Sequence, residues 1–321
     1  MFAFILRRIY QSVLVLFCVS LVVFAILYLS GDPIQMLLPA DASQEQIDEM
    51  RRHLGLDEPF WAQYLSFLRN ALQGDMGRSF TFNQPAVKLI LERAPATLEL
   101  AVSAMILAIL LGIPAGLFAA VKPKSWLTQI IMSGSLFGIS LPVFWMGIML
   151  IMVFSVFLGW LPSSGRGQTA SFGGIQLGFL TWDGCKHLLM PAFTLAIHQV
   201  AMIVRLVRAG MMEVMLQDYI KFLRAKGLSE RRVVLVHALK NIMIPVVTII
   251  GLQTGYTIAF AIVTESIFAW PGMGKLVIDA IHSLDRPVIL AYLLVVALMF
   301  VFINFMVDLT YSFLDPRIRL K

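Results

Sequence analysis

Long apolar blocks alternate with shorter polar segments along the chain. The first block, residues 9–29, is about twenty residues long, which is enough for a helix to cross a hydrocarbon core about 30 Å thick. Further blocks follow at residues 97–121, 125–160, 187–211, 242–262 and 287–314. This pattern predicts an all-α, polytopic membrane protein with six transmembrane helices in one transmembrane domain over residues 1–321.

The block at residues 125–160 carries no charge and is too long for one ordinary span, since a continuous helix of this length measures about 54 Å. A break at Pro142 would divide it into two spans. That extra crossing would place the basic residues between Arg205 and Lys240 outside, against the positive-inside rule. We therefore expect one long helix that is tilted and kinked at Pro142.

Basic residues also set the expected orientation of the chain. Arg7 and Arg8 precede the first apolar block, and the segment 315–321 is basic. Both termini are therefore expected in the cytoplasm. A cleaved signal peptide is the alternative for the first block, but its apolar run exceeds the usual ~7–15 residues and no A-x-A-like site precedes Gly31.

The polar stretch at residues 31–96 predicts an extracytoplasmic helical module after the first span. Ser43 and Gln46 have the spacing of a capping box, before a helix that ends near Gly55. Asp57 is expected to cap a second helix. The apolar stripe of that second helix, which we expect to be core, consists of Phe60, Trp61, Tyr64, Leu65 and Leu68. The glycine- and serine-rich residues 161–186 are expected to form an outside loop.

One strongly basic passage, residues 212–241, lies between two apolar blocks and is expected to be a cytoplasmic loop. Asp218 is expected to cap a short helix in it. A helical period places three apolar residues of this helix on one face, away from Lys221 and Arg224; they are Tyr219, Phe222 and Leu223. A helix of about two turns is not stable alone in water, so we expect it to pack on a partner protein.

A glycine turn follows this short helix. Gly227 is expected to end it in the left-handed conformation, which glycine adopts without steric cost. Ser229 and Glu230 then start a second helix, which is expected to run to about Pro245. The predicted order is helix, glycine turn, helix.

Composition agrees with a membrane protein. Hydrophobic residues make up 59% of the chain and charged residues 14%, and the mean hydropathy is +0.83, whereas soluble proteins have roughly 45–50% and 25%. The net charge of +6 fits cytoplasmic loops rich in Lys and Arg, so it does not indicate nucleic acid. The two cysteines, Cys18 and Cys185, are too few for a disulfide framework and lack the spacing of metal ligands.

The sequence motifs do not indicate a catalytic site. The run from Gly272 to Lys275 hints at a phosphate loop, but Ala269 stands at the first-glycine position and Leu276 follows the lysine. No HExxH motif exists either. We expect a protein that is not an enzyme, has no catalytic residues or metal site, and has no nucleotide site of its own.

Polar groups inside the spans are candidates for a substrate path, because polar groups are costly in lipid. The candidates of this kind are His198, Gln199 and Gln253. The alternative for His198 is an interhelical hydrogen bond, and we expect this second role for Gln253 and Asn304. Glu99 and Glu265 lie near the outer boundary, where a structural role is expected over a contact with a substrate ammonium or a binding protein.

The passage RAKGLSERR, followed by HALKN and Pro245, resembles the cytoplasmic "EAA" loop of ABC-importer permeases. The resemblance is closest to the dipeptide/oligopeptide branch of the binding-protein-dependent transport, inner-membrane component family. It extends over nearly the whole chain through short motifs in the same order, among them Gly31-Asp32-Pro33, Gly55-Leu56-Asp57, Gly74-Asp75-Met76-Gly77, Leu141-Pro142, Trp270-Pro271-Gly272-Met273-Gly274 and Asp315-Pro316-Arg317.

In that family the short helix before the glycine is the coupling helix, which lies in a groove of the ATPase subunit. The resemblance assigns this docking role to Tyr219, Lys221, Phe222, Leu223, Arg224, Ala225, Lys226, Gly227 and Leu228. Two departures stand out. Lys221, Phe222 and Leu223 occupy the place of Glu-Ala-Ala. Phe260 stands where relatives commonly have a small residue, which would narrow the pore or move its gate, so the resemblance adds Phe260 to the candidates for the substrate path.

The resemblance implies a multi-pass permease subunit in the cell inner (cytoplasmic) membrane that imports dipeptides or oligopeptides by alternating access. It would work with a homologous second permease, two cytoplasmic ATPases and a periplasmic or surface binding protein, in contact with membrane lipid. This chain would bind no cofactor, because ATP and Mg²⁺ belong to the ATPases. Nickel, glutathione or another small solute is the alternative cargo. An ion-coupled secondary transporter is the alternative class, although only His198 and Gln199 fit its midplane pattern.

Overall fold

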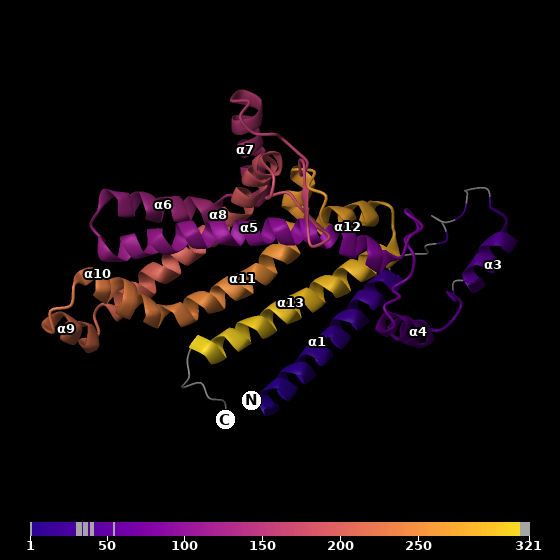
Figure 1. Cartoon of the computed structure of the whole chain (residues 1–321). Helices are drawn as coiled ribbons and strands as arrows, with labels where there is room; N and C mark the ends of the chain where they lie inside the picture. The colour runs from indigo at the N-terminus through magenta and orange to yellow at the C-terminus, as the bar shows by residue number, and fades with distance from the viewer. Residues whose placement is uncertain (1, 30–33, 35–37, 39–41, 54, 315–321) are drawn as a thin grey trace. The chain divides into compact units, whose positions relative to one another are not determined.

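A computed structural model of the chain describes residues 2–29, 34, 38, 42–53 and 55–314 (Figure 1). Helices dominate this part of the chain, so the expected all-α class is confirmed. The chain divides into two compact units. The first takes the chain up to Ala96 together with Pro271–Val301, and the second takes Thr97–Trp270 together with the chain from Phe302 onward.

The first unit is organised around aromatic packing between α1 and α4. Its elements are α1 (Phe2–Leu29), α3 (Gln44–His53), α4 (Phe60–Leu72), α12 (Met273–His282) and the beginnings of α5 (Ala86–Val121) and α13 (Arg286–Leu314). The ring centroid of Phe24 on α1 lies 5.6 Å from that of Phe60, 5.5 Å from Tyr64 and 5.4 Å from Phe67. These edge and stacked contacts fix α4 on the C-terminal part of α1.

The local sequence signals predict the start of α3 correctly and the start of α4 incorrectly. The capping box is confirmed, because the Ser43 amide donates to Gln46 Oε1 at 3.0 Å and the Gln46 amide donates to Ser43 Oγ at 3.3 Å. Asp57 as the cap of the second helix is wrong, since α4 begins at Phe60 with Pro59 as its N-cap. The reason is steric: a residue that precedes proline, here Glu58, is disfavoured in the helical region.

The buried face of α4 also differs from the predicted stripe. Tyr64 is buried, with 2% of its surface exposed, but Trp61 and Leu65 are 61% and 62% exposed. Phe67 takes part in the contact with α1 instead. The predicted stripe is therefore confirmed for Phe60 and Tyr64, which contact α1, and wrong for Trp61 and Leu65, because the aromatic partner on α1 selects which side packs.

A buried carboxylate joins the segment before α5 to the turn between α12 and α13. The Ser79 hydroxyl and the Thr81 amide both donate to Asp285 Oδ2, the amide at 3.2 Å. Asp285 is only 1% exposed. Two segments far apart in the sequence are thus tied by charge-assisted hydrogen bonds inside the first unit. Helix α5 itself begins at Ala86, earlier than the expected residue 97.

The second unit is a bundle in which α8 packs against α6 and α11 (Figure 1). Besides most of α5 and the end of α13, its elements are α6 (Trp126–Ser140), α7 (Val143–Leu150), the π-helical η1 (Ile151–Phe157), β1 (Ala170–Phe172), β2 (Ile175–Leu177), α8 (Trp182–Val214), α9 (Asp218–Ala225), α10 (Glu230–Arg232), the π-helical η2 (Val233–Ala238) and α11 (Leu239–Ile267). A Cβ on Gly112 of α5 would lie 2.8 Å from Ile203 of α8. Glycine therefore permits these helices to approach closely, as in other membrane helix pairs.

The predicted single helix over residues 125–160 is wrong. Helices α6 and α7 meet at an angle of 109°. Leu141 is extended, with φ −82° and ψ 131°, and Pro142 is the N-cap of α7. A proline disfavours the helical conformation of the residue before it, which here breaks the helix completely. Among the described residues, five helices are long and apolar enough to cross a membrane, and there are six candidate spans if this bent pair counts as one.

The helix predicted to end near Pro245 continues instead. Pro245 lies inside α11, and the helical stretch Glu230–Ile267 is 38 residues long. The second helix expected after the glycine turn and the expected fifth span are therefore one element. Pro191 lies inside α8 in the same way. Membrane helices tolerate such prolines because neighbouring groups and local adjustments satisfy the freed backbone.

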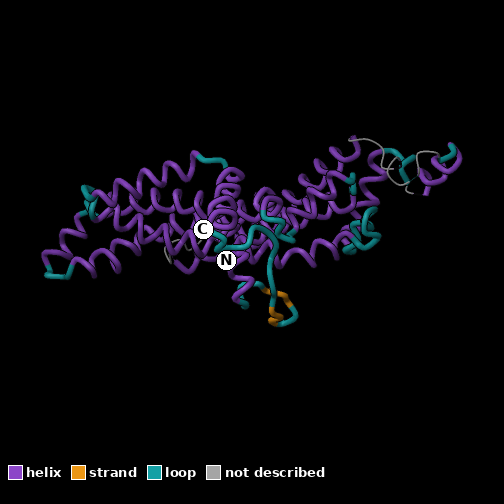
Figure 2. The backbone as a smooth tube through the Cα atoms, turned by 90° about the horizontal axis from the view of Figure 1, so that it is seen from above, coloured by secondary structure: helices purple, strands orange, loops and turns teal. Residues whose placement is uncertain are grey.

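The segment expected to be a loop over residues 161–186 contains a small antiparallel hairpin, drawn in orange in Figure 2. Strand β1 pairs with β2, and Gly173 and Gly174 form the turn with φ values of +58° and +84°. Two successive residues with positive φ are typical of a type I′ turn, which suits the twist of a hairpin. Helix α8 begins at Trp182, earlier than expected, and the hydroxyl of Thr181 caps it by accepting from the Gly184 amide at 2.9 Å.

Candidate functional site

The short helix α9 lies between α8 and the continuous helix that begins at Glu230. It covers Asp218–Ala225, so the expected short helix is present. The expected cap is one residue out: Gln217 is the N-cap, without a side-chain hydrogen bond, and Asp218 is the first helical residue. Asp218 accepts from Lys221 Nζ at 2.8 Å. An acidic residue in the first turn still favours the helix through its dipole.

The glycine turn that ends α9 has the expected geometry. Gly227 has φ +78°, in the left-handed region. Its amide donates to the carbonyl of Arg224 at 2.9 Å, and the amide of Leu228 donates to the carbonyl of Leu223 at 3.3 Å. This pair of bonds is the Schellman motif. A Cβ at Gly227 would meet nothing within 4 Å, so the backbone conformation, and not lack of space, calls for glycine here.

One apolar side chain anchors α9 to its own chain. Ile220 is fully buried, with 0% exposed, where α9 packs against η2. Tyr219 is half-buried, and its hydroxyl accepts a hydrogen bond from Asn241 Nδ2 on α11. Leu223 is also half-buried, whereas Phe222 is 57% exposed. The three residues predicted to share a face are thus divided, because Tyr219 and Leu223 lie on the inner side and Phe222 lies on the outer side. The most buried residue of the inner side is Ile220, which sequence reasoning missed.

The outer surface of α9 combines apolar and cationic groups. The ammonium group of Lys226 lies over the ring of Phe222, 4.5 Å from the ring centroid, in a cation–π contact. Lys221 and Ala225 are exposed, while Leu228 is half-buried. Arg224 donates to both carboxylate oxygens of Glu230, at 2.7 and 3.2 Å. That hydrogen-bonded carboxylate raises the pKa of Arg224 above its ordinary value. A groove with apolar and acidic residues would complement this surface.

Two candidates for a substrate path form a hydrogen-bonded network between α8 and α11. Gln253 Nε2 donates to Gln199 Oε1 at 2.8 Å, and Gln199 Nε2 donates to Thr257 Oγ1 at 3.1 Å. Gln199 is 3% exposed. The expected helix–helix hydrogen bond of Gln253 is therefore confirmed. Such neutral networks join membrane helices at a modest gain of about 1 kcal/mol.

The other two path candidates lie away from this network. His198 is half-buried on α8. Phe260 on α11 is 57% exposed and stacks on Tyr256, with ring centroids 4.2 Å apart. The structure therefore brings Gln199 and Gln253 together in a helix interface and leaves His198 and Phe260 on partly open surfaces. Their role in a path stays a prediction.

A buried ion pair holds the hairpin segment to the N-terminal half of α5. Arg166 donates to Glu99 through its Nε at 2.9 Å, and the Phe179 amide donates to the same carboxylate at 2.7 Å. The Glu99 side chain is 0% exposed and that of Arg166 is 13% exposed. Arg166 also donates to the carbonyl of Gln176 at 2.6 Å. Sequence reasoning expected a structural role for Glu99 but missed Arg166, because no local pattern joins two residues 67 positions apart.

Glu265, the second acidic residue near this boundary, is also internal. It is fully buried, and its Oε1 accepts from the Thr97 hydroxyl at 2.6 Å. Its backbone carbonyl accepts from the Trp270 amide at 2.8 Å. Neither Glu265 nor Glu99 is presented on the surface of this chain, so a structural role fits both.

Two family models match successive parts of this chain. Residues 112–320 match the family model described as "Binding-protein-dependent transport system inner membrane component", and residues 1–101 match the model of the N-terminal part of such membrane components. The Dipeptide transport system permease protein DppB of Alkalihalophilus pseudofirmus is 41% identical, over 99% of this chain and 100% of its own. The Di/tripeptide transport system permease protein DppB of Pseudomonas aeruginosa is 41% identical, over 99% of both chains.

This chain is also similar to a permease named for another cargo and to a chain of a solved structure. The Glutathione transport system permease protein GsiC of Escherichia coli is 38% identical over 100% of both chains. A chain of the MetNI methionine ABC transporter, in an inward-facing conformation, matches with a TM-score of 0.57 and 15% identity. That match covers 71% of this chain and 96% of the other, and at this identity it concerns the fold alone.

Proposed function

Because this chain belongs to the family of binding-protein-dependent transport system inner-membrane components, as a multi-pass permease subunit of an ABC importer, we propose that it forms the path by which short peptides enter the cell. Dipeptides are the proposed main cargo. The support is the full-length identity of 41% to permeases named for dipeptide or di/tripeptide transport. Glutathione is the second candidate, because GsiC is 38% identical over the same length.

The proposed complex contains this chain, a homologous second permease, two cytoplasmic ATPases and a substrate-binding protein outside the membrane. This chain hydrolyses no ATP, and ATP with Mg²⁺ binds to the ATPases. Helix α9 and its glycine turn, residues 218–228, form the docking element. Both ends of the chain and α9 then face the cytoplasm, as the positive-inside rule favours.

The arrangement of α9 carries this proposal. A docking helix must be held firmly enough to transmit a push, yet must keep a surface for the partner. Ile220 supplies the first property through complete burial against η2, and the second comes from Phe222 with Lys226 on the outer side. Closure of the ATPases would move α9, and through it the helix that begins at Glu230, so that the path re-opens on the other side.

Reconstitution of the purified importer in proteoliposomes tests the function directly. With the binding protein outside and ATP inside, uptake of a labelled dipeptide is expected, and uptake without ATP is not. Labelled glutathione in a parallel assay ranks the two cargoes. Uptake driven by an ion gradient in vesicles that contain the permeases without the ATPases would contradict the proposal and favour a secondary transporter.

A further inference from the structure

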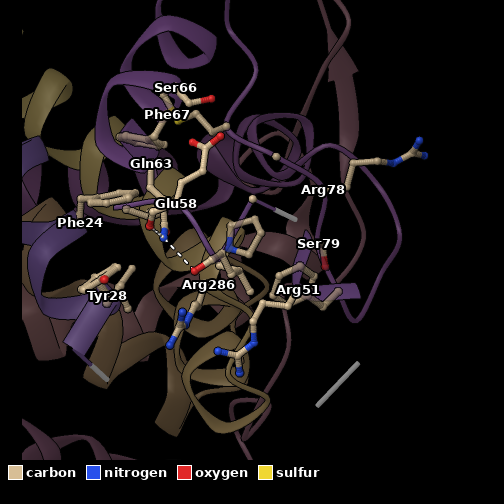
Figure 3. A pocket seen from close by; sticks show the side chains of 18 of the residues that line it. Phe24, Tyr28, Arg51, Glu58, Gln63, Ser66, Phe67, Arg78, Ser79 and Arg286 are labelled. Carbon is tan, nitrogen blue, oxygen red and sulfur yellow. Dashed lines mark hydrogen bonds between the residues drawn. The ribbon is translucent and has the colours of Figure 1, made fainter. Parts of the chain in front are cut away.

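The first unit contains a cavity of about 1140 Å³ (Figure 3), and polar side chains in its wall find partners in the same unit. Gln63 Nε2 donates to the carbonyls of Leu56 and Glu58 at 3.2 and 2.7 Å. The Ser79 hydroxyl donates to Asp285. The second unit differs in this respect, because one side of the pair formed by α8 and α11 carries polar side chains without such partners.

Helix α5 covers one side of this helix pair and leaves the opposite side open. Ile203 of α8 lies against α5, and Glu265 of α11 accepts from the hydroxyl of Thr97 on α5. Helix positions turn by about 100° per residue, so Arg205 points about 160° away from Ile203, and Tyr256 points about 180° away from Glu265. Both side chains therefore leave the pair on the side opposite to α5, which we call the open face.

The polar side chains of the open face have no partner in the part of the chain that the structure describes. The imidazole of His198, the guanidinium of Arg205 and the hydroxyl of Tyr256 form neither a hydrogen bond nor an ion pair there. Arg205 is exposed, Tyr256 is 46% exposed and His198 is half-buried. Arg208, one turn beyond Arg205, adds a buried Nε that has no acceptor among the described residues. These donors call for an acceptor from another molecule.

The same groups lie at the depth of the membrane. His198 is at the middle of Trp182–Val214, a helix long and apolar enough to cross a membrane. Arg205 lies about 10 Å further toward α9, which is still within half of a hydrocarbon core about 30 Å thick. Ionisable groups at this depth are costly against lipid and normally face a polar path or a partner group. Lipid tails therefore do not suit the open face.

Aromatic rings lie beside these polar groups on α11. Gln199 donates to Thr257 across the helix pair at 3.1 Å, so the neighbouring residues His198 and Tyr256 lie at a similar level. The ring of Phe260 stacks on that of Tyr256, with centroids 4.2 Å apart, and Phe260 is 57% exposed. The open face thus has a cationic end toward α9 and an aromatic end away from it.

From this juxtaposition we infer that the open face holds the carboxylate end of the transported peptide, an inference that rests on the proposed function. The guanidinium of Arg205 receives the terminal carboxylate as a bidentate pair. The last side chain of the peptide packs on the rings of Tyr256 and Phe260. An extended dipeptide is about 7 Å long, which fits the spacing of about 10 Å along α8 between the levels of these groups. The peptide then travels with its carboxylate end toward the cytoplasm.

Uptake by the reconstituted importer tests this assignment with a labelled dipeptide and with the same dipeptide as its C-terminal amide. Each is supplied as its complex with the same binding protein, so the selection made by that protein is equal for the parent and the variants. The parent should import the free acid faster. Arg205→Gln should lower uptake of the acid about tenfold and leave uptake of the amide unchanged, because only the acid loses a charge-assisted pair. Arg205→Lys should keep part of the difference.

Two further variants separate this contact from a general effect of charge. Lys124→Gln removes an exposed cation from the turn between α5 and α6, so it should leave both rates unchanged. Phe260→Ala should lower uptake of a dipeptide that ends in phenylalanine several-fold relative to one that ends in glycine. An unchanged ratio of these two dipeptides would overturn the aromatic part of the inference.

The outcomes distinguish this inference from the proposed function. Absence of any dipeptide uptake by the parent would overturn both. Where the parent imports the dipeptide, equal losses of acid and amide uptake with Arg205→Gln would overturn the inference alone, and weak co-purification of the second permease would then assign Arg205 to the subunit interface. Unchanged uptake of both cargoes would overturn it as well, and would leave Arg205 to a lipid headgroup or water.

Discussion

The two ends of α8 are held in different ways. Before its first turn, the hairpin segment closes onto α5 through the buried pair of Glu99 and Arg166, with the Phe179 amide on the same carboxylate. After its last turn, α9 is held by the buried side chain of Ile220 and by one neutral contact from Asn241. The charged pair that holds the N-terminal end of α8 is buried, whereas the charged side chains of α9, beyond its C-terminal end, lie on the surface.

This difference separates a closed structure from the proposed docking element. A buried ion pair is costly to break, because removal of one partner leaves the other charged and without compensation. It therefore keeps the hairpin segment in one arrangement. An aliphatic anchor with exposed charges around it costs less to shift and leaves donors for another protein.

Arg166→Gln should destabilise the subunit most. It leaves the Glu99 carboxylate buried without its cation, which costs about 3–5 kcal/mol. Thermal unfolding of the purified complex should show a clear loss of stability. Glu99→Gln in the same chain should restore part of it, because the uncompensated charge is then gone. A loss no greater than that of Arg78→Gln, at an exposed position, would remove the contrast between the two ends.

Ile220→Ala should loosen α9 while the spans still insert. The cavity left by a fully buried aliphatic side chain costs about 2–5 kcal/mol. We expect normal abundance in the membrane and weak co-purification of the ATPases. Ile220→Val, which removes one methylene group, serves as the graded control at about 1 kcal/mol. Full ATPase association of the Ile220→Ala variant would show that burial of Ile220 is not what positions α9 for the ATPase.

Gly227→Val should strain the turn by an amount on the order of 1–2 kcal/mol, since a β-branched residue disfavours φ +78°. The outer surface of α9 would then be presented at a different angle. Substrate-stimulated ATP hydrolysis should be lost, with membrane abundance unchanged. Gly227→Asn is the matched variant, because asparagine tolerates the left-handed region, and it should keep most of the activity. Unchanged transport by the valine variant would contradict the docking assignment.

Phe222→Ser should have the smallest effect on folding, less than about 0.5 kcal/mol, because the side chain is 57% exposed. Its effect should lie in ATPase association, which binding of the purified ATPase to immobilised permease would measure. Trp182→Ser at the other end of α8, where the side chain is 77% exposed, is the control and should bind the ATPase normally. Equal losses in both variants would mean that the two ends do not differ in docking.

Features set by neighbours in the sequence were predicted well. The capping box of Ser43 and Gln46, the short helix near Asp218 and the left-handed Gly227 all depend on a few adjacent residues, and all are present. The apolar blocks likewise located the membrane helices, because hydrophobic length is itself the signal. The polar contact of Gln253 with another helix followed from the cost of an amide in lipid.

Features set by packing between distant segments were missed. No local pattern distinguishes Pro142, which breaks its helix, from Pro191 and Pro245, which remain inside theirs. The partner of Glu99 could not be named from sequence, since Arg166 reaches it only after the hairpin segment folds back. Ile220 was overlooked for a related reason: the side of a short helix that packs depends on the rest of the chain, here η2.

The unbroken helical stretch that begins beside α9 has a mechanical consequence. Its 38 residues, at about 1.5 Å per residue, make a rod of about 57 Å, roughly twice the thickness of the hydrocarbon core. One end meets α9 through Asn241, and Gln253, further along the rod, meets Gln199. The π-helical turns of Val233–Ala238 lie near the α9 end. If the stretch moves as one body, a tilt of about 10° at that end would displace the far end by about 10 Å, so the proposed docking of α9 would let a small rotation produce a much larger movement at the other end of the helix.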